Sequence, residues 1–154
     1  MKSTAGITES AERFEGKRLD AVTRAIIGAA IEVHKQLGPG LLESAYQTCL
    51  AFELRERGLQ VREQVALPVV YKDVRLDCGY RLDLMVEGSV IVEIKAVEHL
   101  LPIHEAQLLS HLRLAKKEVG LLMNFHSAVL KDGVKRLVNG FADSATLAAL
   151  AVGN

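Results

Sequence analysis

Two short apolar segments that carry charged residues constrain the fold of this 154-residue chain more than any other feature. Residues 80–86 and 90–95 are rich in Val, Ile, Leu and Met, and Glu-Gly-Ser at 87–89 separates them. This pattern predicts two β-strands with a tight connection. Because charged side chains on apolar strands reduce stability unless they pair or bind a cation, the charges of these strands are candidates for a site.

The charges in question are Asp83, Glu93 and Lys95. Glu93 and Lys95 are two residues apart on one strand, so their side chains point to the same face, and Asp83 on the adjacent strand is expected beside them. Two converging carboxylates repel each other unless a cation or a raised pKa relieves them. Mg²⁺ suits such a pair because water and phosphate oxygens complete its octahedron, and a lysine can position the attacking water. The pattern points to metal-dependent phosphodiester chemistry, but the spacing alone fits an exposed Glu–Lys pair on a solvated strand face at least as well.

The first part of the chain is predicted to be helical. Apolar residues recur at helical spacing over 19–37 and again over 42–57. Gly38-Pro39-Gly40 ends the first helix, and Gly58 ends the second. Residues 1–16 are polar and predicted to form a flexible arm.

Strands are predicted after the second helix. Residues 60–68 and 69–76 alternate in polarity, and Lys72-Asp73 is the expected hairpin turn between strands in this region. Pro102 precedes a predicted helix over 103–117.

A continuous apolar run at 120–125 predicts a strand that is buried on both faces. Residues 134–138 fit either a strand or a short helix, and the alanine-rich stretch 145–152 fits a terminal helix or an oligomer contact. The order of elements predicts one α/β domain over 17–142, with helices packed on a mixed sheet, followed by a tail at 143–154 that is a short helix or irregular.

The overall composition limits the choice of partners and location. Nineteen basic residues balance nineteen acidic ones, which argues against a protein that coats nucleic acid non-specifically but leaves a local basic groove open. Cys49 and Cys78 lack metal-ligand spacing and are predicted to be reduced packing residues. Because neither a signal peptide nor an apolar run of about 20 residues is found, we expect a cytoplasmic protein without a membrane partner.

Two further clusters lie on the predicted helices. Glu43, Tyr46 and Gln47 share one face of the second helix, although a glutamate in the first turn is also stabilised by the helix dipole alone. Gln107 and His111 are an i, i+4 pair after the lysine strand, where Gln107 can hold a water or a phosphate oxygen or simply face solvent. Zinc between His104 and His111 is disfavoured because seven residues separate them and no cysteine joins them.

Gly40-x-x-Glu43-x-x-Tyr46 resembles the signature of the GxxExxY protein family, and matches in the same order continue over residues 20–140. They are the segments 38–46, 53–54, 58–59, 64–65, 80–84, 90–96, 105–109 and 120–125. This family is similar to a compact branch of the PD-(D/E)xK nuclease-like superfamily, with a restriction-endonuclease-like α-β-β-β-α-β core. The resemblance therefore implies that core, preceded here by an extra N-terminal helix.

The resemblance also implies roles for five residues. Asp83, Glu93 and Lys95 correspond to the acid and the Glu-x-Lys of the superfamily, Glu43 to its helical glutamate, and Gln107 to the glutamine of the following helix. Two positions depart from the pattern: no proline precedes Asp83, and His111 stands where the family often has a tyrosine.

The leading functional hypothesis is a nuclease-like phosphodiesterase that depends on Mg²⁺ or Mn²⁺ and acts on DNA or RNA. Asp83, Glu93 and Glu43 would hold the metal directly or through water, and the backbone carbonyl of Ile94 is a further ligand. Lys95 would activate water, and Gln107 would support it or the phosphate. The alternative is a non-catalytic oligomerising or binding module that retains the fold, which the neutral charge, few aromatic residues and apolar tail favour. A homo-oligomer is expected in either case, because so small a nuclease core needs a second copy or a partner to grip a duplex.

Overall fold

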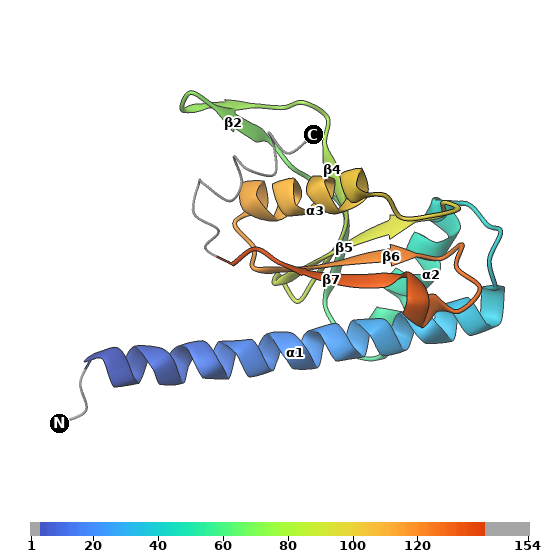
Figure 1. The fold of residues 1–154 in the computed structure, drawn as a ribbon, viewed down its shortest axis with the longest axis horizontal. Coiled ribbons are helices and arrows are strands. Elements are labelled where there is room, and N and C mark those ends of the chain that lie inside the picture. The colour runs from blue at the N-terminus through green and yellow to red at the C-terminus, as the bar shows by residue number, and fades with distance from the viewer. Residues whose placement is uncertain (1–3, 141–154) are drawn as a thin grey trace.

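A five-stranded mixed sheet lies at the centre of the computed structural model, which describes residues 4–140 (Figure 1). Its strand order is β1-β4-β5-β6-β7, and only β5 and β6 run parallel. The strands are β1 (Val61–Ala66), β4 (Arg81–Val86), β5 (Val90–Lys95), β6 (Val119–Asn124) and β7 (Val134–Val138), with a 3₁₀ turn at Leu130–Gly133 before β7. The mixed α/β architecture is thereby confirmed, and residues 134–138 form a strand rather than a helix.

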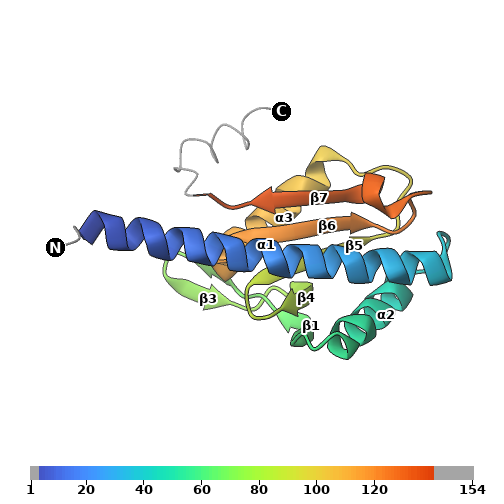
Figure 2. The same ribbon diagram turned by 90° about the horizontal axis from the view of Figure 1, so that it is seen from below.

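Helices cover both faces of the sheet. Helices α1 (Thr4–Leu37) and α2 (Glu43–Glu56) pack on one face, and α3 (Pro102–Ala115) packs on the other (Figures 1 and 2). The order α2-β1-β4-β5-α3-β6 is the α-β-β-β-α-β core that the family resemblance implies. Because α3 connects β5 to the parallel strand β6, the residues at the end of β5 lie close to the start of this helix.

Alternation along β5 divides its side chains between two hydrophobic cores. Val92 and Ile94 belong to the core beneath α1 and α2, whereas Ile91 belongs to the core beneath α3. Successive strand residues point to opposite faces, so Glu93 and Lys95 share the α3 side with Ile91. The burial of Ile94 between them therefore sets the direction of both charged side chains.

Gly120 brings α3 close to β6. A methyl group at this position would meet the side chain of Leu108 at 3.0 Å, which is tighter than ordinary contact. Leu108 and Leu112 of α3 are fully buried against the sheet. The close approach holds the polar residues of α3 at a defined height above the end of β5.

Helix α1 begins at Thr4, so the prediction that residues 1–16 form a flexible arm is wrong for most of that segment. Residues 9–15 are exposed, and the first turns of α1 extend past the ends of the strands (Figures 1 and 2). They lack the apolar periodicity of a packed helix, but Glu and Ala favour helix and Glu15 pairs with Arg18 at 2.7 Å. Periodicity alone could not detect a helical segment whose described side chains, residues 9–15, are exposed.

A small hairpin is inserted between β1 and β4. Its strands β2 (Val69–Tyr71) and β3 (Val74–Leu76) form a separate two-stranded sheet that stands clear of the central one, on the side of α3 (Figure 1). Lys72 and Asp73 both have positive φ angles, of 49° and 63°, as a two-residue type I′ turn requires. The predicted turn is confirmed, although neither of its residues is a glycine.

The remaining predictions have mixed outcomes. Cys49 is half-buried and fits a packing role, but Cys78 is exposed, so that prediction is wrong for Cys78; both thiols are free. The alanine-rich stretch 145–152 lies outside the described residues. In the part of the chain that the structure covers, the helices are too short or too polar to cross a membrane.

The Gly40-x-x-Glu43-x-x-Tyr46 segment forms the junction between α1 and α2. Gly40 has a φ angle of +107°, which favours glycine because it has no Cβ. The Tyr46 hydroxyl donates to the carbonyl of Gly38 at 2.6 Å and accepts the backbone N–H of Leu41 at 3.1 Å. Its buried ring stacks on Phe125 with centroids 4.6 Å apart. The tyrosine thus fixes the turn that places Glu43 at the start of α2.

We therefore expect Tyr46→Phe to destabilise the protein by about 1–2 kcal/mol, because two hydrogen bonds in the turn are lost while the ring packing is kept. The measurement is thermal unfolding followed by circular dichroism. Tyr71→Phe is the matched control, since Tyr71 is 60% exposed on the hairpin. An equal Tm for the two variants would contradict the assigned role of Tyr46.

Candidate active site

The candidate site lies where β4 and β5 stop pairing. The ladder between these strands ends at the pair Leu84–Val92, and one further step in the same register would set Asp83 opposite Glu93. At this point Oδ2 of Asp83 accepts the backbone N–H of Ile94 at 2.8 Å. The carboxylate therefore takes the place of a backbone acceptor and is held against β5. Asp83 and Glu93 are neighbours, as the sequence predicts.

Gln64 holds the second oxygen of Asp83. Its amide nitrogen lies 3.3 Å from Oδ1 of Asp83 and also donates to Oε1 of Gln47 on α2. Gln64 has a φ angle of 48°, which is uncommon for a residue other than glycine within a strand. Sequence reasoning assigned no role to Gln64, because neither its backbone conformation nor its long-range partners can be inferred from local pattern.

Glu93 is buried beneath α3, with 7% of its surface exposed. Burial raises the pKa of its carboxyl, and the negative charge of Asp83 raises it further. The hydrogen bond with Nδ1 of His111, at 2.9 Å, and the charge of Lys95 lower the pKa in part, but burial prevails. Lys95 is half-buried and interacts electrostatically with Glu93, as their two-residue spacing on one strand predicts.

His111 is the residue that sequence reasoning underestimated most. The sequence pairs His111 with Gln107 on the helix and marks it as a departure from the tyrosine of the resembling family, but it does not show that His111 is the hydrogen-bond partner of Glu93. His104 has a different role from His111. Its Nδ1 accepts the backbone N–H of Leu101 at 3.0 Å and so caps the start of α3. The two histidines thus have different hydrogen-bond partners.

Asn124 fixes the chain just after Lys95. Its side chain is buried, and it accepts the backbone N–H of Val97 at 3.1 Å and donates to the carbonyl of the same residue at 2.8 Å. The backbone N–H of Phe125 also donates to the carbonyl of Lys95 at 2.9 Å. These bonds join the ends of the parallel strands β5 and β6, so the loop that follows the lysine is anchored.

Glu43 reaches the same end of β5 from α2. Its Oε1 accepts the backbone N–H of Ala96, the residue after Lys95, at 3.3 Å. This bond places Glu43 next to the site but at its outer edge, where the side chain is exposed. Gln47, one turn later on α2, joins the network of Gln64 instead.

Gln107 lies on the other side of the site. It is exposed on α3, one turn before His111, and both residues line a pocket of about 500 Å³ together with Tyr80. The ring centroids of Tyr80 and His111 are 6.0 Å apart. His111 is therefore shared between the carboxylate pair and the pocket.

The oxygen donors of the site fit a hard divalent cation. Asp83 and Glu93 repel each other, and Asp83 lies at the edge of β5 to which the N–H of Ile94 points. In an extended strand the N–H and C=O of one residue point to the same side, so the Ile94 carbonyl faces this gap as well. Among residues 4–140, no three His, Cys, Asp or Glu side chains are grouped closely enough to hold an ion alone. Mg²⁺ does not require three, because it retains water and binds phosphate oxygens.

Comparison with known proteins agrees with this geometry. The chain matches the family model of the PD-(D/E)XK nuclease superfamily over residues 20–137, from within α1 to β7. The match covers well over half of the chain, which therefore belongs to this superfamily. Its restriction-endonuclease-like fold is confirmed. No curated protein and no solved structure matches the chain.

The raised pKa of Glu93 leads to a stability prediction for metal-free protein. Between the ordinary pKa of the carboxyl and its raised value, the folded state binds more protons than the unfolded state, so stability falls as pH rises. Glu93→Gln lacks this penalty and should have a Tm a few degrees above wild type at neutral pH, with the difference shrinking as pH falls through the raised pKa. Thermal unfolding in a chelator between about pH 5 and pH 8 measures it.

The control for this experiment is Glu118→Gln, which alters an exposed acid just before β6 and should change the Tm little at any pH. A Glu93→Gln variant less stable than wild type at neutral pH would show that the His111 bond outweighs the cost of burial.

Proposed function

We propose that the chain is a divalent-metal-dependent phosphodiesterase that acts on nucleic acid. One observation carries the proposal: Asp83 and Glu93 are held side by side where β4 and β5 part, although burial and the neighbouring Asp83 disfavour the charge of Glu93. Such an arrangement is costly for a purely structural purpose and is typical of a site that binds a cation. Membership of a nuclease superfamily supports the same class of reaction.

The carboxylates would hold Mg²⁺ or Mn²⁺, with the Ile94 carbonyl as a further ligand and Glu43 acting from the rim through water. When bound, the ion supplies a Lewis acid that makes water a better nucleophile and offsets charge on the phosphate. His111 orients Glu93 through its bond to Oε1 and favours the ionised carboxyl.

Lys95 and Gln107 have complementary proposed roles. The Lys95 ammonium lies on the same side of β5 as Glu93, where it can hold the attacking water and stabilise negative charge on the phosphorus oxygens. The bond from the backbone N–H of Phe125 to the carbonyl of Lys95 restricts the position of the lysine. Gln107 carries an amide that can donate to a phosphate oxygen or to that water from the α3 side.

The second candidate is a binding module that keeps the fold without catalysis. It is favoured by the fact that the acids already have protein partners: Asp83 accepts from Ile94 and Gln64, and Glu93 bonds His111. An oligomer belongs to this reading. Light scattering on the full chain and on a chain ending at Gly140 tests whether an oligomer forms. A monomer in both cases would remove the oligomer from this hypothesis.

The decisive experiment is cleavage by wild type and Asp83→Asn of labelled single-stranded DNA, double-stranded DNA and RNA, titrated with Mg²⁺ or Mn²⁺. We expect wild type to cleave at least one substrate only with metal, and Asp83→Asn to be slower by about 100-fold or more, because a ligand charge is lost.

Asp132→Asn is the matched control, because Asp132 is exposed in the 3₁₀ turn before β7. It should cleave as wild type does. Equal rates for wild type and Asp83→Asn, or no cleavage across the panel with either metal, would favour the binding module.

A further inference from the structure

A pocket adjoins the carboxylate pair on the α3 side of the sheet. It lies between the start of β2, the segment before β4 and helix α3, and has a volume of about 500 Å³. Its main lining residues are Val69, Tyr80, Ile103, Gln107, Ser110 and His111. His111 also bonds Glu93, so this side chain links the Tyr80 pocket to one of the proposed metal ligands.

The lining combines flat apolar surface with a polar edge. Tyr80 is 51% exposed, its ring is inclined at 55° to that of His111, and Ile103 and Val69 extend the apolar wall. Gln107 and Ser110 add an amide and a hydroxyl, which supply both hydrogen-bond donors and acceptors. Unpaired nucleobases are bound in this way, by stacking on aromatic rings and hydrogen bonding at their edges.

The zero net charge of the chain also favours a site that binds a base. Its net charge is zero, so affinity for a duplex through phosphate neutralisation alone would be weak. Few cations lie close to Tyr80 in sequence or in the hairpin: Arg81 donates to the carbonyl of Tyr80 at 2.9 Å and pairs with Asp77 at 3.9 Å, and Arg75 lies on β3 opposite Val70. With few cations, contacts to a base must supply part of the affinity.

We propose that the Tyr80 pocket holds one unpaired nucleobase of the substrate beside the phosphate to be cleaved. The inference rests on the proposed function of the neighbouring carboxylates and narrows its substrate class to single-stranded or locally unpaired nucleic acid. A base within a regular duplex cannot enter without leaving its stack, which costs free energy. The pocket thus discriminates against intact duplexes.

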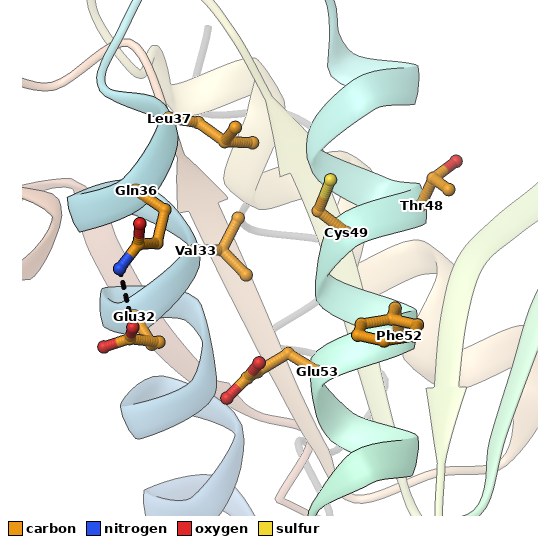
Figure 3. Close-up of a pocket in the computed structure, with 8 residues that line it drawn as sticks. All are labelled: Glu32, Val33, Gln36, Leu37, Thr48, Cys49, Phe52 and Glu53. Carbon is orange, nitrogen blue, oxygen red and sulfur yellow. Dashed lines mark hydrogen bonds between the residues drawn. The ribbon is translucent and has the colours of Figure 1, made fainter.

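A second groove on the opposite side of the sheet provides a control. It lies between α1 and α2, and Figure 3 shows Val33 and Leu37 of α1 directed toward α2, which carries Cys49 and Phe52. Phe52 is 63% exposed, comparable with Tyr80, but α2 packs on the face away from α3. Phe52→Ala therefore removes an exposed aromatic ring without altering the Tyr80 pocket.

The test measures binding in an Asp83→Asn background, so that cleavage does not interfere. The probe is a short single-stranded oligonucleotide with the fluorescent base aminopurine at one position at a time, made as DNA and as RNA. We expect quenching at one position, roughly 10-fold weaker binding after Tyr80→Ala, and near wild-type binding for Tyr80→Phe and Phe52→Ala. A duplex of the same sequence should bind more weakly than either single strand.

An abasic site at the quenched position completes the experiment. It should weaken binding by the same factor as Tyr80→Ala, and the two changes together should cost no more than either alone. Additive losses, or equal affinity for Tyr80→Ala and Tyr80→Phe, would overturn the pocket assignment even if wild type cleaves nucleic acid. Conversely, full binding effects without metal-dependent cleavage would refute the proposed catalysis and leave the base-binding pocket standing.

Discussion

The hydrogen bond from the backbone N–H of Ile94 to the carboxylate of Asp83 is the contact on which the site depends. It ends the β4–β5 ladder without leaving a backbone donor unpaired, and it brings a second acid close to Glu93. A carboxylate can replace a backbone carbonyl here only because the strands part at this residue. The same parting opens the edge of β5 toward which the Ile94 carbonyl points.

The two faces of the sheet differ in role: one forms a structural core and the other carries the charged residues of β5. Beneath α1 and α2, Ile94 and its neighbours form a core that anchors β5, and Tyr46 fixes the turn that leads into α2. Beneath α3, the same strand presents Glu93 and Lys95. The burial of Glu93 is tolerated because His111 and Lys95 oppose part of its cost. Stability and proposed chemistry thus share one strand through its two-residue alternation.

The placement of His111 connects the carboxylates with the pocket and, under the proposed function, would let a small domain of zero net charge recognise a substrate through one of its bases. Duplex-binding proteins gain much of their affinity by releasing counterions, which requires many basic residues on one face. This chain instead places an aromatic ring and polar groups next to its acids. A site that recognises a base by stacking needs less positive charge, because stacking does not depend on phosphate neutralisation.

Local pattern was sufficient for the strands 80–86 and 90–95, the turn at Lys72-Asp73, the buried strand β6 and the proximity of Asp83 to Glu93. These features follow from side-chain alternation and short connections, which involve residues near one another in the sequence. Only the tertiary structure revealed three features. They are the left-handed backbone conformation of Gln64, the hydrogen bond between Glu93 and His111, and the hydrogen bonds between the Asn124 side chain and the backbone of Val97. Each depends on a hydrogen bond between separate elements or on a backbone angle that no periodicity encodes. The sequence by itself determined which charges meet, and the packing of β1 and α3 against β4 and β5 decided that Gln64 and His111 are the side chains that bond them.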